Sequence, residues 1–319
     1  MEVWGGNDAG TRGVVVPGLD IWVLSRPLGT AGASDDDAEL SRASGGDVHY
    51  LSSCATGRVT RALLADVSGH GESVGSEAAS LRLLMRRYVN YSDMRRFVGE
   101  LNREFLRLSR LGMFATAIAL TYWSPTRSLV MCNAGHPRAL RYRARTRSWT
   151  PVRGTRSDAA GDAAADLPLG ILDAVEYTQA EVTLAPGDMV LLYTDGLIES
   201  RPEGGKPWGE AGLIEQLGRL DAGDPQGLVQ SLFARLRGHA AGRIDDDLTL
   251  MLLRPNELGI RRSLSERMTA VTAAIKGTMA HLTGSKSEPL MEWSFVNVFG
   301  FLIPAVNRIK RARARASEE

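Results

Sequence analysis

The stretch VTRALLADVSGHG, residues 59–71, contains the pattern from which the fold can be argued. Val59 to Val67 is apolar enough to predict a largely buried strand. That strand carries Asp66 near its end and runs into Ser-Gly-His-Gly, whose glycines permit a sharp exit. The stretch therefore predicts a buried strand that delivers a carboxylate to one edge of a sheet.

Patterns on both sides of this stretch predict a mixed α+β fold. Strand-like runs cover residues 14–24, 48–51, 115–123, 128–133, 177–184, 189–194 and 248–253. Helical spacing covers residues 77–88, 94–108, 212–220 and 226–237. Turns at 124–126 and 185–188 predict two hairpins, whereas 143–166 lacks periodicity and predicts a mobile surface insertion without regular structure. Strands joined by short turns are antiparallel, and we expect helices to pack on them.

The composition excludes several classes of protein. Lys and Arg number 38 and Asp and Glu 37, so the net charge of +1 supplies no field that would draw the chain to nucleic acid. The only cysteines, Cys54 and Cys132, are too far apart in sequence to suggest a disulfide scaffold or a thiolate zinc site. Residues 1–10 lack a basic region followed by an apolar run, and no stretch has about 18 apolar residues, so we expect neither secretion nor a membrane span. We expect a folded, cytoplasmic protein with no nucleic-acid partner.

Aspartates stand at the ends of several predicted strands. Asp66 and Asp195 end strands, Asp246 begins one, and Asp47 could join them from a fourth segment. In an antiparallel sheet the end of one strand and the start of another can share an edge, so these carboxylates can converge. A carboxylate cluster without His or Cys suits Mg²⁺ or Mn²⁺. Two such ions can activate a water molecule and hold a phosphoryl group for in-line attack.

Six motifs occur in order along the chain. They are Gly45-Gly46-Asp47, Ala65-Asp66-Val67-Ser68-Gly69-His70-Gly71, Asn133-Ala134-Gly135-His136-Pro137, Leu167-Pro168-Leu169-Gly170, Leu192-Tyr193-Thr194-Asp195-Gly196 and Asp246-Asp247-Leu248-Thr249. With these motifs the chain resembles the metal-dependent protein phosphatases (PPM, protein phosphatase 2C-like), specifically their bacterial SpoIIE-type branch, over roughly residues 13 to 254. The resemblance implies a central antiparallel β-sandwich flanked by helices on both faces and two Mn²⁺ or Mg²⁺ ions.

The resemblance also implies an activity and roles for particular residues. It implies a serine/threonine phosphatase in which a metal-bridging hydroxide attacks the phosphoryl group. Asp66 would bridge the two metals, and Asp195 would join it as a catalytic ligand. The other metal ligands would be Asp47, the Val67 carbonyl and Asp246. The substrate in this branch is a phosphoserine or phosphothreonine, usually on a STAS-type anti-sigma-factor antagonist in a bacterial partner-switching pathway.

Several roles stay open at this point. His70 could act as a general acid toward the leaving alkoxide, or it could only shape the glycine turn. Asp245 and Asp247 compete with Asp246 for the ligand position, and we expect His136 to be a structural loop residue.

Two other functions compete with the active phosphatase. A pseudophosphatase would use the same fold to bind a phosphoprotein without turnover. An esterase is suggested by Gly71-Glu72-Ser73-Val74-Gly75, but a nucleophile should stand directly after the strand, which ends near Val67.

The last part of the chain has a different character. We expect a phosphatase domain over residues 1–254 and a helical extension over 255–319. Within the extension, the apolar stretch 293–306 is too short to span a membrane and precedes a basic stretch, 308–315. Residues 293–315 could therefore lie on the inner face of an anionic membrane or dock a protein partner.

Overall fold

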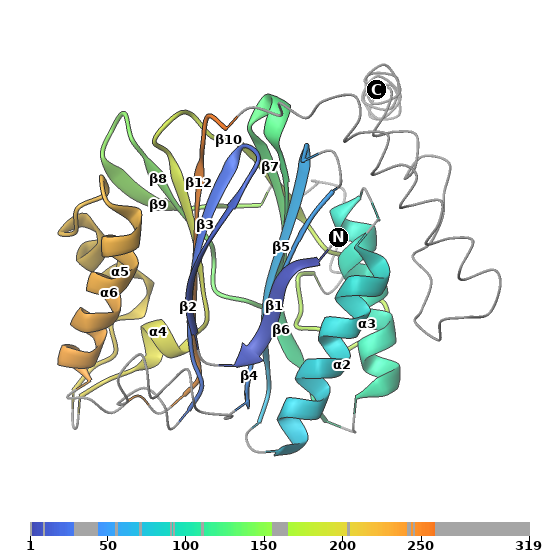
Figure 1. Cartoon of the computed structure of the whole chain (residues 1–319). Coiled ribbons are helices and arrows are strands. Elements are labelled where there is room, and N and C mark those ends of the chain that lie inside the picture. The colour runs from blue at the N-terminus through green and yellow to red at the C-terminus, as the bar shows by residue number, and fades with distance from the viewer. Residues whose placement is uncertain are drawn as a thin grey trace.

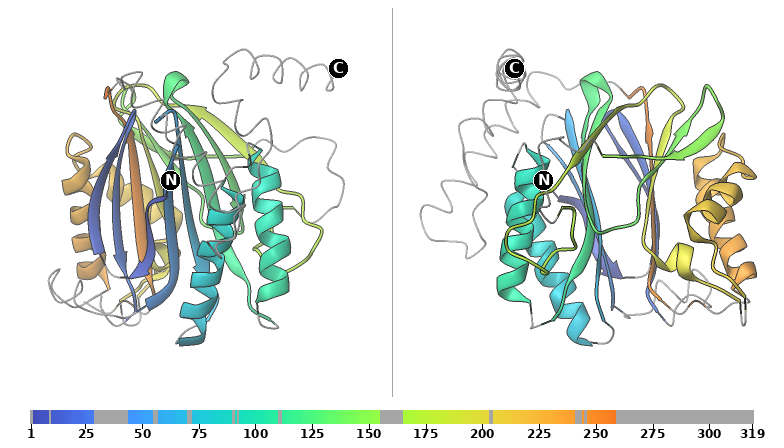
Figure 2. Two further views of the ribbon diagram at one scale, coloured as in Figure 1. Left: turned by 45° about the vertical axis from the view of Figure 1, so that its right-hand side comes forward. Right: turned by 180° about the vertical axis from the view of Figure 1, so that it is seen from behind.

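The computed structural model describes twelve segments of the chain, and they fold into a layered body (Figure 1). The described residues are 2–8, 10–28, 44–54, 57–69, 72–89, 91, 93–109, 112–154, 165–202, 205–240, 244 and 246–258. Two six-stranded sheets pack face to face, and every strand pair within them is antiparallel. Helices cover the outer face of each sheet, as Figures 1 and 2 show. The α+β sandwich with helices on both faces is confirmed.

The first sheet has the strand order β1-β4-β5-β6-β7-β10. Its strands are β1 (Glu2–Asp8), β4 (Ser44–Ser53), β5 (Val59–Val67), β6 (Ala115–Trp123), β7 (Ser128–Ala134) and β10 (Gln179–Thr183). A short 3₁₀ helix, η1 (Ser124–Thr126), joins β6 to β7 as the predicted hairpin turn. Helices α2 (Glu72–Tyr88) and α3 (Met94–Leu108) cover this sheet.

The second sheet has the strand order β2-β3-β12-β11-β8-β9. Its strands are β2 (Gly10–Val16), β3 (Leu19–Arg26), β12 (Leu248–Pro255), β11 (Met189–Tyr193), β8 (Leu140–Arg143) and β9 (Ser148–Pro151). Helices α4 (Gly196–Glu199), α5 (Gly209–Gly218) and α6 (Pro225–His239) lie on its outer side.

Strand β5 shows how the sequence places the site. Its side chains alternate between the two faces of the sheet. Leu63 and Ala65 pack with the residues of α2 and α3, whereas Ala62 and Leu64 pack between the two sheets. Because both faces are covered, the strand is apolar nearly throughout. Asp66 has the same parity as Leu64, so it lies at the end of the row that faces the second sheet.

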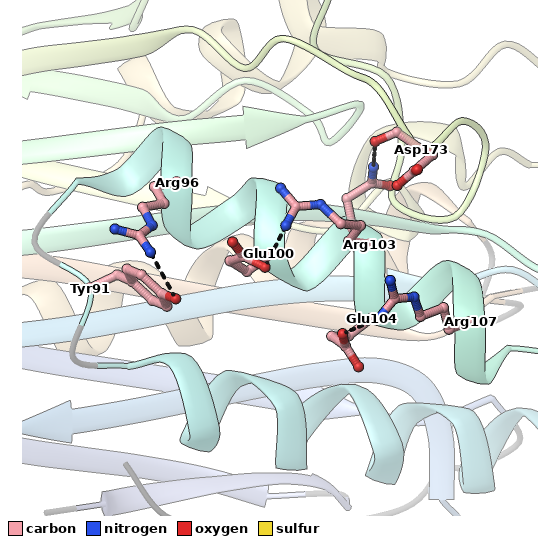
Figure 3. A network of polar contacts seen from close by, with 8 residues as sticks. Tyr91, Arg96, Glu100, Arg103, Glu104, Arg107 and Asp173 are labelled. Atoms are coloured by element: carbon pink, nitrogen blue, oxygen red, sulfur yellow. Dashed lines mark hydrogen bonds and ion pairs between the residues drawn. The ribbon is translucent and has the colours of Figure 1, made fainter. Parts of the chain in front are cut away.

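Helix α3 is amphipathic, and its outer face is covered by polar contacts (Figure 3). Glu100 accepts from Arg103 at 2.8 Å and Glu104 from Arg107 at 3.0 Å. On its buried side, Asn102 donates to the carbonyls of Leu172 and Asp173 and accepts from the Gly170 N–H. The helix thereby holds the loop that follows the Leu167–Gly170 motif.

Three expectations about secondary structure are corrected. Residues 140–151 form the β8-β9 hairpin, so the first part of the predicted insertion at 143–166 is regular. Residues 185–188 are not a hairpin turn, because β10 pairs with β7 in the first sheet while β11 pairs with β8 and β12 in the second. Helix α2 begins at Glu72, earlier than predicted, so Ser73 is helical and the esterase hypothesis is excluded.

The last described strand closes the sandwich against its N-terminal part. Strand β12 ends at Pro255, and the Asn256 side chain donates to the Val16 carbonyl and to Asp20. The extension from residue 259 onward, including 293–315, lies outside the described residues. Among the helices that are described, none is both long and apolar enough to cross a membrane.

Candidate metal centre

Pairing within the sheets brings the predicted aspartates to one end of the sandwich. Asp47 lies directly opposite Asp66 in the β4-β5 ladder. In the second sheet Tyr193 pairs with Leu250, so the end of β11 and the start of β12 share an edge. Asp195 follows the first of these strands and Asp246 precedes the second. Antiparallel topology thus groups the carboxylates within each sheet, as expected from the sequence.

Electrostatic coupling joins the carboxylates of the two sheets. Burial, together with the charges of the neighbouring carboxylates, raises the pKa of Asp66 from 3.8 to about 7. Those carboxylates are Asp195, Asp246, Asp247 and Glu199. Burial also raises the pKa of Asp195 and of Asp246, again with help from neighbouring carboxylates. Like charges at short range oppose ionisation. A bound cation would balance the carboxylate charges and so stabilise the ionised site.

Asp47 gives the clearest sign that a cation belongs here. Its side chain is 3% exposed, and its Oδ2 accepts from the Thr194 hydroxyl at 2.8 Å. Its Oδ1 is buried and meets no hydrogen-bond donor among the residues that the structure describes. Burial and the charges of Asp66 and Asp247 hold the pKa of Asp47 well above its usual value. A buried carboxylate oxygen without a donor is costly, and a hard divalent cation would satisfy it.

The Val67 carbonyl lies against the glycine that precedes Asp47. A Cβ placed on Gly46 would come within 2.7 Å of the Val67 oxygen and 3.4 Å of Asp66 Oδ1. Only glycine therefore lets the start of β4 approach the end of β5 this closely. The arrangement is compatible with the predicted backbone ligand at Val67, which stays a prediction.

Asp246 and Asp247 have different surroundings. Asp246 is exposed at the edge, and its Oδ1 accepts from the Asp247 N–H at 2.8 Å. Asp247 is buried, and its two oxygens accept from the N–H groups of Leu28 and Gly46. Asp246 is thus the freer of the two to bind an ion, while Asp245 lies outside the described residues.

Two further predicted residues can be placed. His70, the candidate general acid, lies outside the described residues, so its role stays a prediction. His136 is buried in the turn after β7, where its N–H donates to Asn133 Oδ1 and its Nδ1 contacts the Thr116 hydroxyl at 2.8 Å. Burial lowers the pKa of His136 to about 3, so the ring is neutral at physiological pH. These contacts fit the structural role expected for it.

The donor set fits Mg²⁺ or Mn²⁺ that keeps part of its water shell. Within the segments that the structure describes, no three His, Cys, Asp or Glu side chains are grouped closely enough to enclose one ion. Mg²⁺ commonly binds through one or two carboxylates and retains several waters, so a closed protein cage is not required. Oxygen ligands from two facing sheets match that chemistry.

Sequence reasoning missed the role of Thr194 in shaping the site and left the role of Asp247 open. The Thr194 hydroxyl donates to Asp47 and thereby links the two sheets. It also accepts from the Thr249 N–H, in its own sheet, at 2.9 Å. Asp247, on the second sheet, also links the two sheets, because it accepts from the Gly46 N–H on the first. Strand parity could have indicated Thr194, because it shares the inward face of β11 with Val190 and Leu192.

Comparisons with known proteins agree with this fold. The family model for stage II sporulation protein E (SpoIIE) matches residues 56–256. A crystal structure of RsbU and RsbW domains from Mycobacterium tuberculosis aligns with TM-score 0.59 and 22% identity, over 86% of this chain and 72% of that one. The PP2C phosphatase domain of SpoIIE from Bacillus subtilis aligns with TM-score 0.59 and 18% identity, over 75% and 64% of the two chains.

A third structure is described with metal bound. The catalytic domain of the serine/threonine phosphatase PstP in complex with 2 manganese ions aligns with TM-score 0.51 and 15% identity, over 75% of this chain and 99% of that one. No curated protein matches the chain. Since the family model covers well over half of its length, the chain belongs to the SpoIIE family of PP2C-type protein phosphatases.

Proposed function

We propose that this protein is a metal-dependent phosphatase that hydrolyses phosphoserine or phosphothreonine in a protein substrate. The observation that carries the proposal is the buried Oδ1 of Asp47, which has no donor within the described part of the chain. Asp47 lies directly opposite Asp66, and the second sheet supplies further carboxylates. A scaffold that only bound a phosphoprotein would gain nothing from repelling carboxylates beside an anionic ligand.

The residues present would hold two divalent ions. Asp66, coupled to carboxylates on both sheets, is the candidate shared ligand. Asp47, the Val67 carbonyl, Asp195 and Asp246 would complete the two sites, with retained waters filling the remaining positions. When bound, such ions supply an activated water nucleophile and neutralise charge on the phosphoryl oxygens.

The chain's own groups would prepare the site for this chemistry. The Thr194 hydroxyl orients the Asp47 carboxylate and lowers its pKa, which favours the ionised form that binds metal. Burial keeps bulk water away from Asp47, where electrostatic interactions are correspondingly strong. His70 is proposed as the proton donor to the leaving alkoxide.

The proposed substrate is a phosphoprotein of a partner-switching pathway. Family membership and the structural likeness to RsbU and SpoIIE domains support this substrate class, and a STAS-type anti-sigma-factor antagonist is the specific candidate. Action in the cytoplasm, with the segment 293–315 attached to the inner membrane face or to a protein partner, is part of the same proposal.

The test is Mn²⁺-dependent phosphate release from p-nitrophenyl phosphate and from phosphoserine and phosphothreonine peptides. Asp66→Asn and Asp195→Asn should abolish release. Asp221→Asn should not, because Asp221 lies in a surface loop away from these strands, where it accepts from the Gly223 N–H. A folded wild type that binds Mn²⁺ but releases no phosphate from any substrate would favour the pseudophosphatase instead.

A further inference from the structure

The side chain of Asp247 joins three segments that are distant in sequence. It stands just before β12 in the second sheet and is 9% exposed. Its Oδ2 accepts from the Gly46 N–H at 2.5 Å, and its Oδ1 accepts from the Leu28 N–H at 2.6 Å. Gly46 immediately precedes Asp47 in the first sheet, and Leu28 follows β3. One carboxylate therefore fixes the start of β4 against the second sheet.

A second carboxylate makes the reciprocal connection at the same end of the sandwich. Asp47, on the first sheet, accepts from the Thr194 hydroxyl on the second. Asp247, on the second sheet, accepts from Gly46 on the first. Each sheet thus contributes one buried acceptor to the other, and both connections involve residues adjacent to candidate metal ligands.

The position of the Asp247 carboxylate explains why residue 45 is a glycine. A Cβ on Gly45 would lie 2.5 to 2.6 Å from the carboxyl carbon and both oxygens of Asp247. Those distances are shorter than van der Waals contact, and the obstructing atoms are held by two backbone donors. The Gly45-Gly46 pair therefore leaves room for the Asp247 carboxylate as well as for the approach to Val67.

We propose that Asp247 is a positioning residue that sets the separation of Asp47 and Asp246 and thereby the affinity of the site for divalent cations. Both of its oxygens are engaged by backbone N–H groups, so it acts on the ion through its neighbours. Hydrogen bonds from N–H groups to a carboxylate are short and strong, which suits them to holding ligands in place before an ion arrives. The inference rests on the metal site of the proposed function.

Two substitutions perturb this connection by different routes. Asp247→Asn has one acceptor oxygen, so its NH₂ group must face one of the two N–H donors. Gly45→Ala leaves Asp247 chemically intact but displaces its carboxylate. The control is Asp188→Asn, because Asp188 is a buried carboxylate at the other end of β11 from Asp195. It also accepts from two backbone N–H groups, those of Ala144 and Ala185, and it pairs in addition with Arg141.

The measurement is Mn²⁺ binding by isothermal titration calorimetry, with kcat for p-nitrophenyl phosphate at saturating Mn²⁺ beside it. We expect the Kd for Mn²⁺ to rise about 10- to 100-fold in Asp247→Asn and Gly45→Ala, as when groups that orient metal ligands are removed. The kcat at saturating Mn²⁺ should be retained, and Asp188→Asn should bind Mn²⁺ like the wild type.

Other outcomes would overturn the proposal. Folded variants with a lower Tm but unchanged Mn²⁺ affinity would make Asp247 a merely structural residue. Loss of kcat at saturating Mn²⁺ in Asp247→Asn but not in Gly45→Ala would make it a ligand or a catalytic residue. If Asp247→Asn does not fold, Gly45→Ala decides. Calorimetry also works without turnover, so failure of the phosphatase proposal would be recognised separately.

Discussion

Replacing Thr194 by valine removes a hydroxyl group that serves two buried partners at once. Thr194 is fully buried, donates to Asp47 Oδ2 at 2.8 Å and accepts from the Thr249 N–H at 2.9 Å. Valine has nearly the same shape, so the loss is polar rather than steric. Each partner then lacks its hydrogen bond, and leaving a buried polar group unsatisfied costs about 1 to 3 kcal/mol. We therefore expect Thr194→Val to lower the free energy of unfolding by ~2 to 6 kcal/mol.

The assay is urea unfolding of the metal-free protein at neutral pH, with Thr194→Ser as the matched control. Serine keeps the hydroxyl and loses one methyl group, which should cost only about 1 kcal/mol. Thr194→Val should also weaken Mn²⁺ binding, because the Thr194 hydrogen bond lowers the pKa of Asp47 and favours its ionised form. Equal unfolding free energies for the valine and serine variants would refute this reasoning.

Three further predictions concern pH, the α3 loop and the extension. Without metal, stability should fall as the pH rises from about 4 to about 7, because Asp66, with its pKa raised from 3.8 to about 7, keeps its proton only in the folded chain over that range. Thermal melts in EDTA test this, and Mn²⁺ should reverse the slope because its ligands must be deprotonated; an EDTA slope of the opposite sign would contradict it. Asn102→Ala should lower the free energy of unfolding, measured in urea, by ~2 to 4 kcal/mol, because the Gly170 N–H and two carbonyls lose their hydrogen bonds. A change below about 1 kcal/mol would show that these groups find other partners. If residues 293–315 bind membranes, the full chain should co-sediment with anionic liposomes while a chain ending at Leu258 should not; equal behaviour would exclude membrane binding through this segment.

The parts of the site that follow from strand periodicity could be predicted from the sequence. Val59 to Val67 predicted a strand buried on both faces, and the structure places Asp66 at its inward-facing end, opposite Asp47. Asp195 and Asp246 likewise lie at one edge because adjacent antiparallel strands bring their ends together. Local pattern and chain direction are sufficient for these placements.

Contacts between the sheets could not be predicted in the same way. The hydrogen bonds from Thr194 to Asp47 and from the Gly46 N–H to Asp247 span 147 and 201 residues. The error at residues 185–188 has a related cause. A Pro-Gly turn predicts a hairpin locally. Here, however, β10 pairs with β7 in the first sheet and β11 pairs with β12 in the second, so the chain crosses from one sheet to the other.

The central claim is that carboxylates from two facing sheets form one two-ion centre, and the most direct test counts the ions. Mn²⁺ bound per chain can be measured by isothermal titration calorimetry and checked by electron paramagnetic resonance of the unbound ion. The account predicts that the wild type binds two Mn²⁺ and that Asp66→Asn, which lacks the shared ligand, binds at most one in a chain that remains folded. A wild type that binds none, or an Asp66→Asn variant that still binds two with unchanged affinity, would contradict it.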